Sequence, residues 1–276
     1  MGNINMSNTV DQRNSADFIK KSLKIKTIIT MSTVITLLAI WFLTTKMQWI
    51  SEIFVPSPEQ VFHAFKETFF NGYKGNTLLQ HLYFSMYRLM ISFLLAGSIG
   101  VPLGLACGYR LNLSAVFEPL VHFYRILPPL AYYSLLVMWM GIENGSKIAL
   151  LFLAAFPPIF ISCAAGVKNV KSSYILGAYT LGAGNRQVFW NVIFPSCLPE
   201  IFTGMRTSIG VAYSTLVAAE MTAATSGIGW MVLDAGRFLR SDIIFTGILV
   251  MGITGVILDA LLKLLEAKIV PWKGKE

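Results

Sequence analysis

The chain contains 276 residues, of which 55% are hydrophobic and only 13% are charged, and its formal net charge is +8. Soluble domains carry about 25% charged residues, so this composition would leave a soluble surface with too few polar side chains. The high apolar content also excludes a disordered chain. The sequence therefore indicates an integral membrane protein, whose excess of Lys and Arg marks the cytoplasmic side rather than a nucleic-acid site.

The chain begins with a polar, basic head at 1–26, which the uncharged run 27–45 follows. A cleaved signal peptide is one interpretation, but the head is long and no A-x-A cleavage site follows the run. We therefore expect a cytoplasmic head and a retained first transmembrane helix. The next segment, 46–83, is expected in the periplasm, with a short helix that starts near Pro58.

Five further stretches are apolar enough to cross a membrane, since a helical span needs ~20 mostly apolar residues. They lie between Arg88 and Arg110, from Ile126 or an earlier start near Val116 to Ile142, between Lys147 and Lys168, from Ile201 to about Leu233, and from Ile243 to Leu265. These stretches predict an all-α membrane core over 84–267 and, with the first helix, six transmembrane helices. Lys and Arg are more numerous in the segments on the N-terminal side, so both termini, including the tail 268–276, are expected in the cytoplasm.

The inner segment 168–199 is too long for a simple turn and predicts two short helices. Ser172-Ser173 is expected to cap the first helix, and Gly182-Ala183-Gly184 is expected to end it, because glycine adopts left-handed turns at little cost. Asn185 is expected to cap the second helix, which Pro195 then ends.

The second of these helices would carry an apolar stripe. Its members are Val188, Phe189, Val192 and Ile193. The stripe either packs on the protein's own spans or docks into a groove of a partner, and the spacing alone does not separate these two interpretations.

Ionisable side chains at membrane depth cost ~2.5–3.5 kcal/mol on insertion, so each needs a physical reason. Glu220 is the deepest of them. It either pairs with an arginine, for which Arg206 or Arg125 is a candidate, or faces a cation in a water-filled pathway. Arg125 itself precedes a Pro128-Pro129 break, where freed backbone groups line cavities. It either meets an anion there or is a structural arginine.

Two other charged residues, Arg88 and Asp259, lie nearer to the ends of spans, where snorkelling to the interface explains them. On these grounds we assign six residues to a pathway across the membrane. They are Arg125, Pro128, Pro129, Tyr132, Ser214 and Glu220.

Catalytic and metal sites are not expected. The chain contains no G-x-x-x-x-G-K-[ST] phosphate loop, and His63, His81 and His122 lack the spacing of metal ligands. The stretch Ala96-Gly97-Ser98-Ile99-Gly100 lies in an apolar span, so close helix packing explains it better than a nucleophile elbow does.

Within the inner segment, Leu176-Gly177-Ala178-Tyr179-Thr180-Leu181-Gly182 followed by Pro195 resembles the EAA loop of ATP-binding-cassette (ABC) importer permeases. Leu176 and Gly177 depart from that pattern, which usually has Glu and Ala. Nearly the whole chain from Ile28 onward is similar to the taurine and alkanesulfonate permeases of this superfamily. The most similar stretches are Phe54-Val55-Pro56-Ser57-Pro58, Tyr124-Arg125-Ile126-Leu127-Pro128-Pro129-Leu130-Ala131-Tyr132, Gly141-Ile142-Glu143-Asn144-Gly145-Ser146-Lys147-Ile148, Ser214-Thr215-Leu216-Val217-Ala218-Ala219-Glu220 and Pro271-Trp272-Lys273-Gly274.

The resemblance implies a type I ABC importer permease fold in the inner (plasma) membrane of a bacterium, with a second copy of the chain beside it in the lipid. It also implies two ATP-binding-cassette ATPase subunits and a periplasmic or surface substrate-binding protein as partners, and no nucleic acid. This chain would bind no cofactor and would not be an enzyme, because the ATPase uses ATP-Mg. The residues implied to couple to the ATPase are Ala178, Leu181, Gly182, Ala183, Arg186, Gln187 and Pro195.

The implied function is import of taurine or a related small sulfonate by alternating access. A secondary transporter of a small organic anion or zwitterion, driven by an ion gradient, is the alternative, but such proteins usually have more spans and a detectable repeat. A membrane-embedded enzyme is less favoured still, because no paired catalytic groups lie at one depth.

Overall fold

The computed structural model describes residue 25 and residues 28–273, so the predicted basic head, except for Ile25, and the last residues of the tail lie outside the described part. The described residues form helices and no strand. The chain divides into two compact units, Met1–Phe62 and His63–Glu276. The first unit contains the helix Ile28–Lys46, and the Trp41 indole there donates to the Pro56 carbonyl at 3.0 Å.

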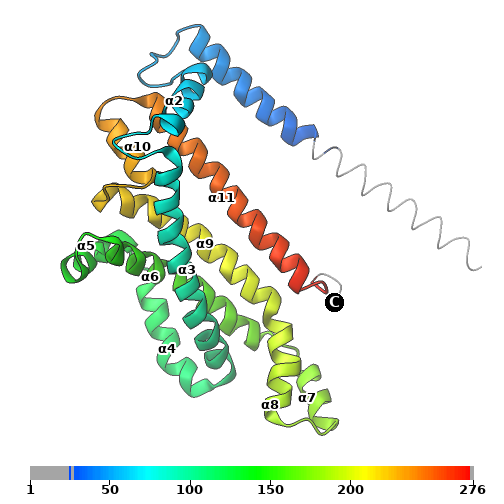
Figure 1. Ribbon diagram of the computed structural model, residues 1–276. Helices are drawn as coiled ribbons and strands as arrows, with labels where there is room; N and C mark the ends of the chain where they lie inside the picture. Colours follow the sequence, from blue (N-terminus) through cyan, green and yellow to red (C-terminus); the bar gives the residue numbers. More distant parts are fainter. Residues whose placement is uncertain (1–24, 26–27, 274–276) are drawn as a thin grey trace, which may run out of the picture. The chain divides into compact units, whose positions relative to one another are not determined.

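The second unit is a bundle of helices joined by short connections (Figure 1). The elements in chain order, beginning with the helix that crosses the boundary of the units, are α2 (Pro58–Phe70), α3 (Leu78–Tyr109), α4 (Leu111–Tyr124), α5 (Pro129–Met140), α6 (Asn144–Lys168), α7 (Ser172–Thr180), α8 (Asn185–Val188), the π-helical segment η1 (Phe189–Ile193), α9 (Phe194–Ala223), α10 (Ile228–Arg237) and α11 (Ser241–Ile269).

Four helices among the described residues are long and apolar enough to cross a membrane: Ile28–Lys46, α3, α6 and α11. They correspond to four of the spans expected from the sequence. The helix α9 is long enough at 30 residues but is more polar than these four.

The two other expected spans are each divided. A single span from Ile126 to Ile142 is wrong, because α4 ends at Tyr124 and only the 12-residue α5 follows. Pro128 and Pro129 cause the break, since the residue before a proline disfavours the helical conformation. The stretch expected from Ile201 to Leu233 is divided too: α9 ends at Ala223, and Gly227, with φ +123°, precedes α10.

The helices α3 and α6 run parallel to each other. Near their starts, Arg88 of α3 donates to Asn144 of α6 at 2.8 Å, and near their ends Gly108 of α3 lies against Val167 of α6. The connection from the end of α3 to the start of α6 therefore has to run back along the bundle, and α4 and α5 together form this return.

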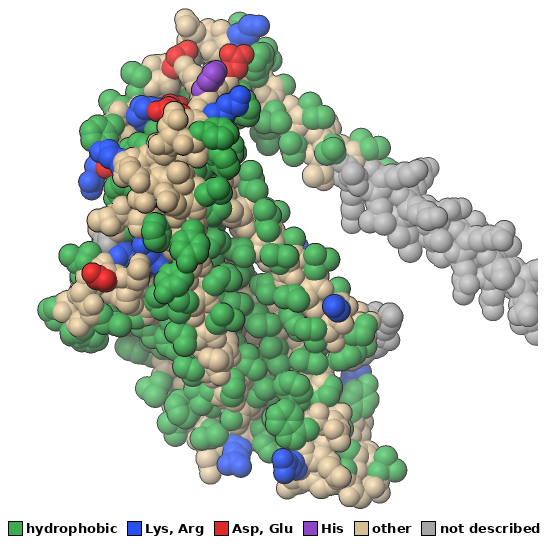
Figure 2. All heavy atoms as spheres, viewed as in Figure 1, with side chains coloured by type: hydrophobic (Ala, Val, Ile, Leu, Met, Phe, Trp, Pro, Cys, Tyr) green, Lys and Arg blue, Asp and Glu red, His purple; other side chains and the backbone are tan. Residues whose placement is uncertain are grey.

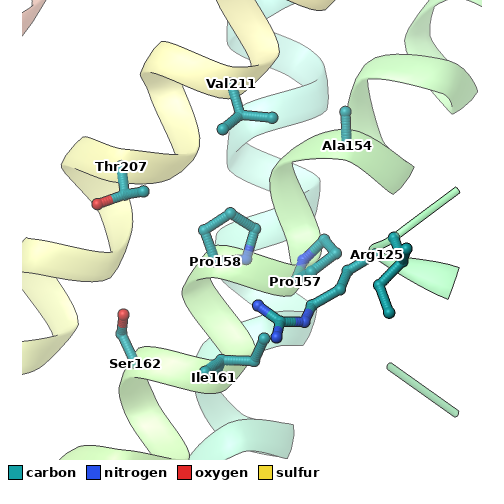
Figure 3. A pocket seen from close by; sticks show the side chains of 9 residues that line it. Arg125, Ala154, Pro157, Pro158, Ile161, Ser162, Thr207 and Val211 are labelled. Atoms are coloured by element: carbon teal, nitrogen blue, oxygen red, sulfur yellow. The ribbon is translucent and has the colours of Figure 1, made fainter. Parts of the chain in front are cut away.

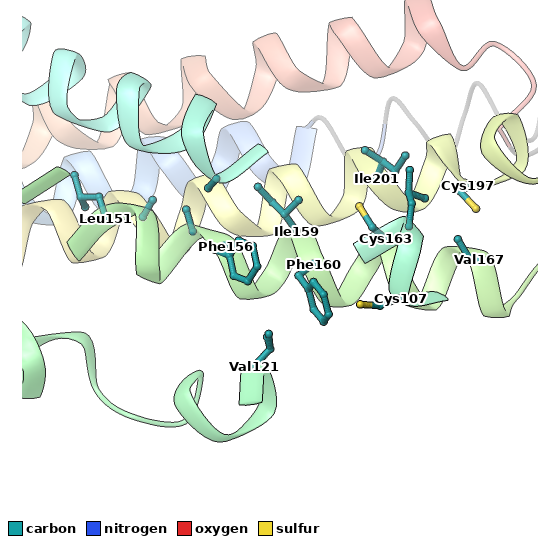
Figure 4. Close-up of a cluster of buried hydrophobic side chains, with 14 of the residues drawn as sticks. Cys107, Val121, Leu151, Phe156, Ile159, Phe160, Cys163, Val167, Cys197 and Ile201 are labelled. Carbon is teal, nitrogen blue, oxygen red and sulfur yellow. The ribbon is translucent and has the colours of Figure 1, made fainter. Parts of the chain in front are cut away.

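Small residues let α3 and α6 approach closely, and Figure 4 shows the apolar core that results. Gly100, Gly104 and Gly108 recur at every fourth position of α3, and a Cβ atom on Gly104 would lie 2.6 Å from the Phe160 carbonyl oxygen. Gly204 of α9 lies in the same way against Ser162 of α6. In a membrane the hydrophobic effect does not drive helices together, because lipid is itself apolar. Close backbone approach of this kind, with its van der Waals contacts, stabilises helix association instead.

One end of the second unit is held by charged side chains of α2, α10 and the start of α11. Asp234 accepts a hydrogen bond from the Tyr73 hydroxyl at 2.8 Å, and Arg240 forms ion pairs with Glu67 at 3.1 Å and Asp242 at 2.8 Å. Burial and the hydrogen bond to Asp234 raise the pKa of Tyr73 to about 12, so the phenol remains a donor at neutral pH. Between this end and the α7–α8 end, hydrophobic side chains cover most of the face seen in Figure 2.

The close packing at Gly100, Gly104 and Gly108 of α3 leads to a first prediction. Gly104→Ala should lower the thermal unfolding midpoint of the purified chain, because the added methyl group would force α3 and α6 apart at a cost of ~1–3 kcal/mol. Gly97→Ala on the same helix is the matched control, since a Cβ there meets no atom within 4 Å. Tryptophan fluorescence during heating in detergent measures both, and equal midpoints would contradict the packing described.

Candidate functional site

The hairpin formed by α7 and α8 has a well-defined turn at its tip. The N–H of Ala183 donates to the Ala178 carbonyl at 3.1 Å, and the N–H of Gly182 donates to the Tyr179 carbonyl at 2.9 Å. These two bonds form a Schellman motif, which needs a left-handed residue after the helix, and Gly182 supplies it with φ +85°. The predicted break at Gly182 is therefore confirmed.

The predicted side-chain caps of this hairpin are wrong. Ser172 is the first residue of α7 rather than its cap, and Lys171, at the cap position, makes no side-chain cap hydrogen bond. Asn185 likewise begins α8, and its side chain accepts a hydrogen bond from the Tyr179 hydroxyl at 3.0 Å, which ties the two helices together. Gln187 closes the turn instead, by accepting from the Gly184 N–H at 2.9 Å.

The prediction that Pro195 ends the second helix is also wrong. The helical path continues from α8 through η1 into α9 without a break. In the π-helical turn the N–H of Phe194 donates to the Phe189 carbonyl, five residues earlier, so the hydrogen-bond ladder shifts just before Pro195. Pro195 then falls in the first turn of α9, where a missing N–H is tolerated.

The apolar stripe of the second helix packs on the protein's own core, which decides between the two interpretations left open by the sequence. Val188 and Ile193 are buried, and Phe189 and Val192 pack against the same cluster. The hairpin presents other side chains outward. Leu181 at its tip is 90% exposed, and Leu176 and Arg186 are exposed as well, whereas Ala178 and Ala183 are partly buried.

A cavity of about 580 Å³ lies between the α4–α5 break, α6 and α9 (Figure 3). Three polar side chains line it: Arg125 from the break, Ser162 of α6 and Thr207 of α9. The remaining lining residues are Ile126, Ala154, Pro157, Pro158, Ile161 and Val211. With Arg125 present and no carboxylate in the lining, the cavity is suited to a ligand that carries a negative charge.

The outward face of α9 is polar, in contrast to that of α11. Thr203, Thr207, Gly210 and Ser214 lie exposed along one face of α9. As far as Leu261 the exposed residues of α11 are apolar, among them Ile248, Leu249, Ile253, Val256, Ile257 and Leu261, and the exposed Lys263 and Lys268 follow near its end. Helix surfaces that face lipid are apolar, whereas polar helix surfaces face the interior of a bundle or water. The exposed face of α11 is therefore suited to contact with lipid. The polar face of α9 is suited to contact with a second polar surface or to lining a pathway.

The six residues assigned to the pathway from the sequence do not form one group. Arg125 lines the cavity, and Ser214 lies on the same face of α9 as Thr207 and Val211. Pro128 precedes α5, Pro129 begins it, and Tyr132 packs with the cluster that contains the buried Tyr133. None of these three is among the residues that line the cavity.

Glu220 lies in a buried polar network away from the cavity. Its carboxylate pairs with the Arg88 guanidinium at 2.7 Å, and the two side chains are only 1% and 4% exposed. Ser85 donates to the carboxylate at 2.8 Å, while Arg88 also donates to Asn144 and to the Ser226 carbonyl, both at 2.8 Å. Burying charge is tolerated when it is paired and hydrogen-bonded on all sides, as it is in this network.

The expectations for these two residues need correction. The partner of Glu220 is Arg88, not Arg206 or Arg125, and Arg88 is buried rather than snorkelling. Arg206 instead pairs with Asp259 of α11 at 3.0 Å. Arg88 and Glu220 lie more than a hundred residues apart in the sequence, so local sequence patterns could not predict that they pair.

The same network satisfies the first N–H groups of α10. The N–H of Gly229 donates to Glu220 at 2.9 Å, that of Ile228 to Ser85 at 3.0 Å, and that of Gly227 to His81 Nδ1 at 3.1 Å. A helix start leaves such groups without intrahelical partners, so these side chains replace an ordinary cap. A Cβ atom on Gly227 would lie 2.3 Å from the Glu220 carboxyl group, which makes glycine necessary there.

Ser162 and Thr207 were missed in the sequence, although two signals point to them. Pro157-Pro158 interrupts hydrogen bonding inside an apolar span, and small or hydroxylated residues recur along one side of α9 at helical spacing. Together they indicate a site where the prolines of one helix lie beside the polar face of the next.

These features define a class of protein: an all-helical membrane permease, in which an exposed hairpin is continuous with a helix that lines a polar cavity. Residues 100–271 match the family described as the binding-protein-dependent transport system inner membrane component. The chain belongs to this family.

Comparison with individual relatives shows which members of this family the chain resembles. The chain is 42% identical over 248 residues to the taurine transport system permease protein TauC of Escherichia coli (strain K12), with 90% of each chain covered. It is 32% identical over 238 residues to SsuC of Bacillus subtilis (strain 168), a protein named for aliphatic sulfonates transport, with 86% of this chain and 85% of that one covered. The resemblance to taurine and alkanesulfonate permeases is thereby confirmed.

A solved structure supports the fold. The MetNI methionine ABC transporter in an inward-facing conformation has a chain that matches with a TM-score of 0.60 at 16% identity, covering 70% of this chain and 94% of that one. At this identity the likeness concerns the fold alone, and it confirms an all-helical ABC permease architecture.

The buried pair makes a second prediction. Glu220→Gln and Arg88→Met should each destabilise the chain by ~3–5 kcal/mol, because each leaves one charge buried without its partner. The double variant should be less damaging than the sum of the two, with a coupling of ~1 kcal/mol or more. Thermal unfolding midpoints in detergent measure all four proteins of the cycle. Strictly additive effects would show that the two side chains do not interact.

Proposed function

We propose that this chain is the permease subunit of an ATP-driven importer, which moves taurine or a related small sulfonate across the inner membrane of a bacterium by alternating access. Membership of the family and the names of the relatives support the transport role and the class of substrate. The observation that carries the mechanism is the continuous helical path from Asn185 through η1 to Ala223.

The α7–α8 hairpin is the proposed contact for an ATPase subunit. Leu181 projects at its tip. Binding of a partner that covers this side chain would be favourable, because it would remove apolar surface from water. Arg186 and Lys171 are exposed nearby, and so is Arg110 at the end of α3. A partner surface with an apolar pocket and an acidic rim would complement these side chains.

Movement of the hairpin would reach the membrane through α9. The hairpin is fixed to the core by Val188 and Ile193, and α9 continues from it for 30 residues, about 45 Å. Along this length α9 carries Thr207 of the cavity and then Glu220 of the buried network. ATP binding would draw two hairpins together, and α9 would reorient around the cavity, provided the ATPase contacts the hairpin differently in its two states.

The topology we propose retains six crossings. The spans are Ile28–Lys46, α3, the broken α4–α5 return, α6, α9 and α11. The α7–α8 end carries Arg110, Lys168, Lys171 and Arg186, which favours the cytoplasm for this end and for both termini. A second copy would cover the polar face of α9, a binding protein would deliver substrate outside, and ATP-Mg would act on the ATPase.

Leu181→Asp supplies the third prediction. In proteoliposomes that contain the permease, its ATPase and its binding protein, this change should lower ATP-dependent taurine uptake at least tenfold. A charge would replace the apolar contact at the tip, and burial of a leucine contributes ~1.5–3 kcal/mol.

Leu111→Asp is the matched control, because Leu111 is 85% exposed at the same end but lies outside the hairpin. Its uptake should stay near that of the unsubstituted protein. Normal uptake by Leu181→Asp would refute the proposed contact. Uptake by the permease alone, driven by an ion gradient without the ATPase, would favour the secondary-transporter alternative.

A further inference from the structure

A groove of about 680 Å³ lies between the end of α3, the start of α4 and the segment from α8 to the start of α9, and it shares no lining residue with the cavity described above. Two rings from its opposite sides meet, since the centroids of Tyr109 and Phe189 are 5.3 Å apart. Trp190 lies against Phe189, also at 5.3 Å. Val101 and Leu105 extend the α3 side of the groove. Its walls are therefore mainly apolar and aromatic.

Two arginines line the same groove, Arg110 from the connection between α3 and α4 and Arg186 from α8. Both are exposed, and neither forms an ion pair within the described part of the chain. No Asp or Glu is among the described residues that line the groove. Guanidinium groups bind phosphate oxygens through paired, charge-assisted hydrogen bonds. A complementary occupant therefore carries a negative charge, such as a phosphate, next to a long apolar portion.

The groove runs from the level of the lipid headgroups into the level of the acyl chains. The helix α3 has 32 residues, ~48 Å, which exceeds the ~30 Å hydrocarbon core, so its ends reach the headgroup region. Arg110 follows the last residue of α3, and Val101 lies nine residues, ~14 Å, farther into the span. Tyr109 and Trp190 are of the residue types that are enriched at this boundary.

The α3 side of the groove continues an exposed apolar face of the helix. Leu95, Pro102 and Tyr109 are all exposed and lie seven residues apart, close to two turns, so they share one face of α3. Apolar surface of a spanning helix is suited to contact with lipid. An acyl chain that occupied the groove would therefore continue along a surface that lipid already covers, which favours lipid over a segment of a soluble partner.

We propose that this groove binds a phospholipid with an anionic headgroup, whose phosphate lies on Arg110 and Arg186 and whose acyl chain lies along the apolar wall. This inference goes beyond the proposed transport function, because the lipid is a bound ligand and not a transported substrate. A lipid held in this way would contact α3 and η1 at once. It would therefore stabilise the contact between the membrane span and the helical path that leads to the hairpin.

The test compares two lipids with the same palmitoyl and oleoyl chains, phosphatidylglycerol, which is anionic, and phosphatidylcholine, which is not. Native mass spectrometry of the delipidated permease–ATPase complex counts the bound molecules of each lipid during a titration. Phosphatidylglycerol should bind at least fivefold more tightly. Arg110→Gln and Arg186→Gln should each weaken its binding about fivefold and leave phosphatidylcholine unchanged, because each removes one cation near the membrane surface.

Lys171→Gln is the matched control. Lys171 is exposed at the same end of the protein but does not line the groove, so this change removes one positive charge and should leave the binding of both lipids unaltered. Arg110→Gln decides the outcome if Arg186→Gln impairs assembly with the ATPase, since Arg110 lies outside the hairpin.

A phosphatidylglycerol with a photoreactive diazirine in its acyl chain locates the bound molecule. Cross-links should fall within residues 101–113 and 185–194, and they should decrease in Arg110→Gln.

Four results would overturn this inference. They are equal affinity for the two lipids, unaltered phosphatidylglycerol binding in Arg110→Gln, cross-links confined to other segments, and displacement of the lipid by an equal concentration of inorganic phosphate, which would indicate a site for a free anion. Binding to the permease alone that is lost in the complex would also overturn it, because the ATPase or the second copy would then occupy the groove.

Discussion

The ion pair between Arg88 and Glu220 is the interaction on which the rest of the arrangement depends, because its two buried side chains join four helices. Arg88 comes from α3 and also binds the start of α6, while Glu220 comes from the last turns of α9 and accepts from the start of α10. A charge buried in this way has to be paired and hydrogen-bonded, so any movement that separates the partners is costly. The far end of α9 is therefore a fixed point of the bundle.

The other end of α9 leads to the exposed hairpin. It continues through η1 into the hairpin, whose turn at Gly182 leaves Leu181 almost fully exposed. Between these ends, α9 contributes Thr207 to a cavity whose opposite wall contains Pro157 and Pro158. A helix that is anchored at one end, exposed through its hairpin at the other and lined with polar groups in between is suited to the proposed coupling of a partner to a pathway. The small residues Gly104 and Gly204 allow the close packing that keeps α3, α6 and α9 together.

Composition and charge-free runs were sufficient to predict an all-helical membrane protein and the positions of Ile28–Lys46, α3, α6 and α11. The hairpin break at Gly182 was predictable too, because only local backbone geometry decides it. The effect of Pro195 was misjudged, since a π-helical turn absorbed the missing N–H. The break at Pro128 was expected, but the single span drawn across it was wrong, because only the 12-residue α5 follows. The partner of Glu220 could not be predicted, because it depends on which helix faces meet across the core, and the local pattern around Arg88 resembles an interfacial arginine.

The central claim is that α9 and the hairpin move as one body, and spectroscopy on the assembled importer tests it most directly. Spin labels on Ser173→Cys and Ser214→Cys report the hairpin and the polar face of α9, and the native Cys107, Cys163 and Cys197 are buried and so resist labelling. Distances between the labels of the two copies are measured by double electron–electron resonance with and without ATP. We predict that ATP changes both distances together. A change at position 173 with none at position 214 would contradict the account, because the hairpin would then move without α9.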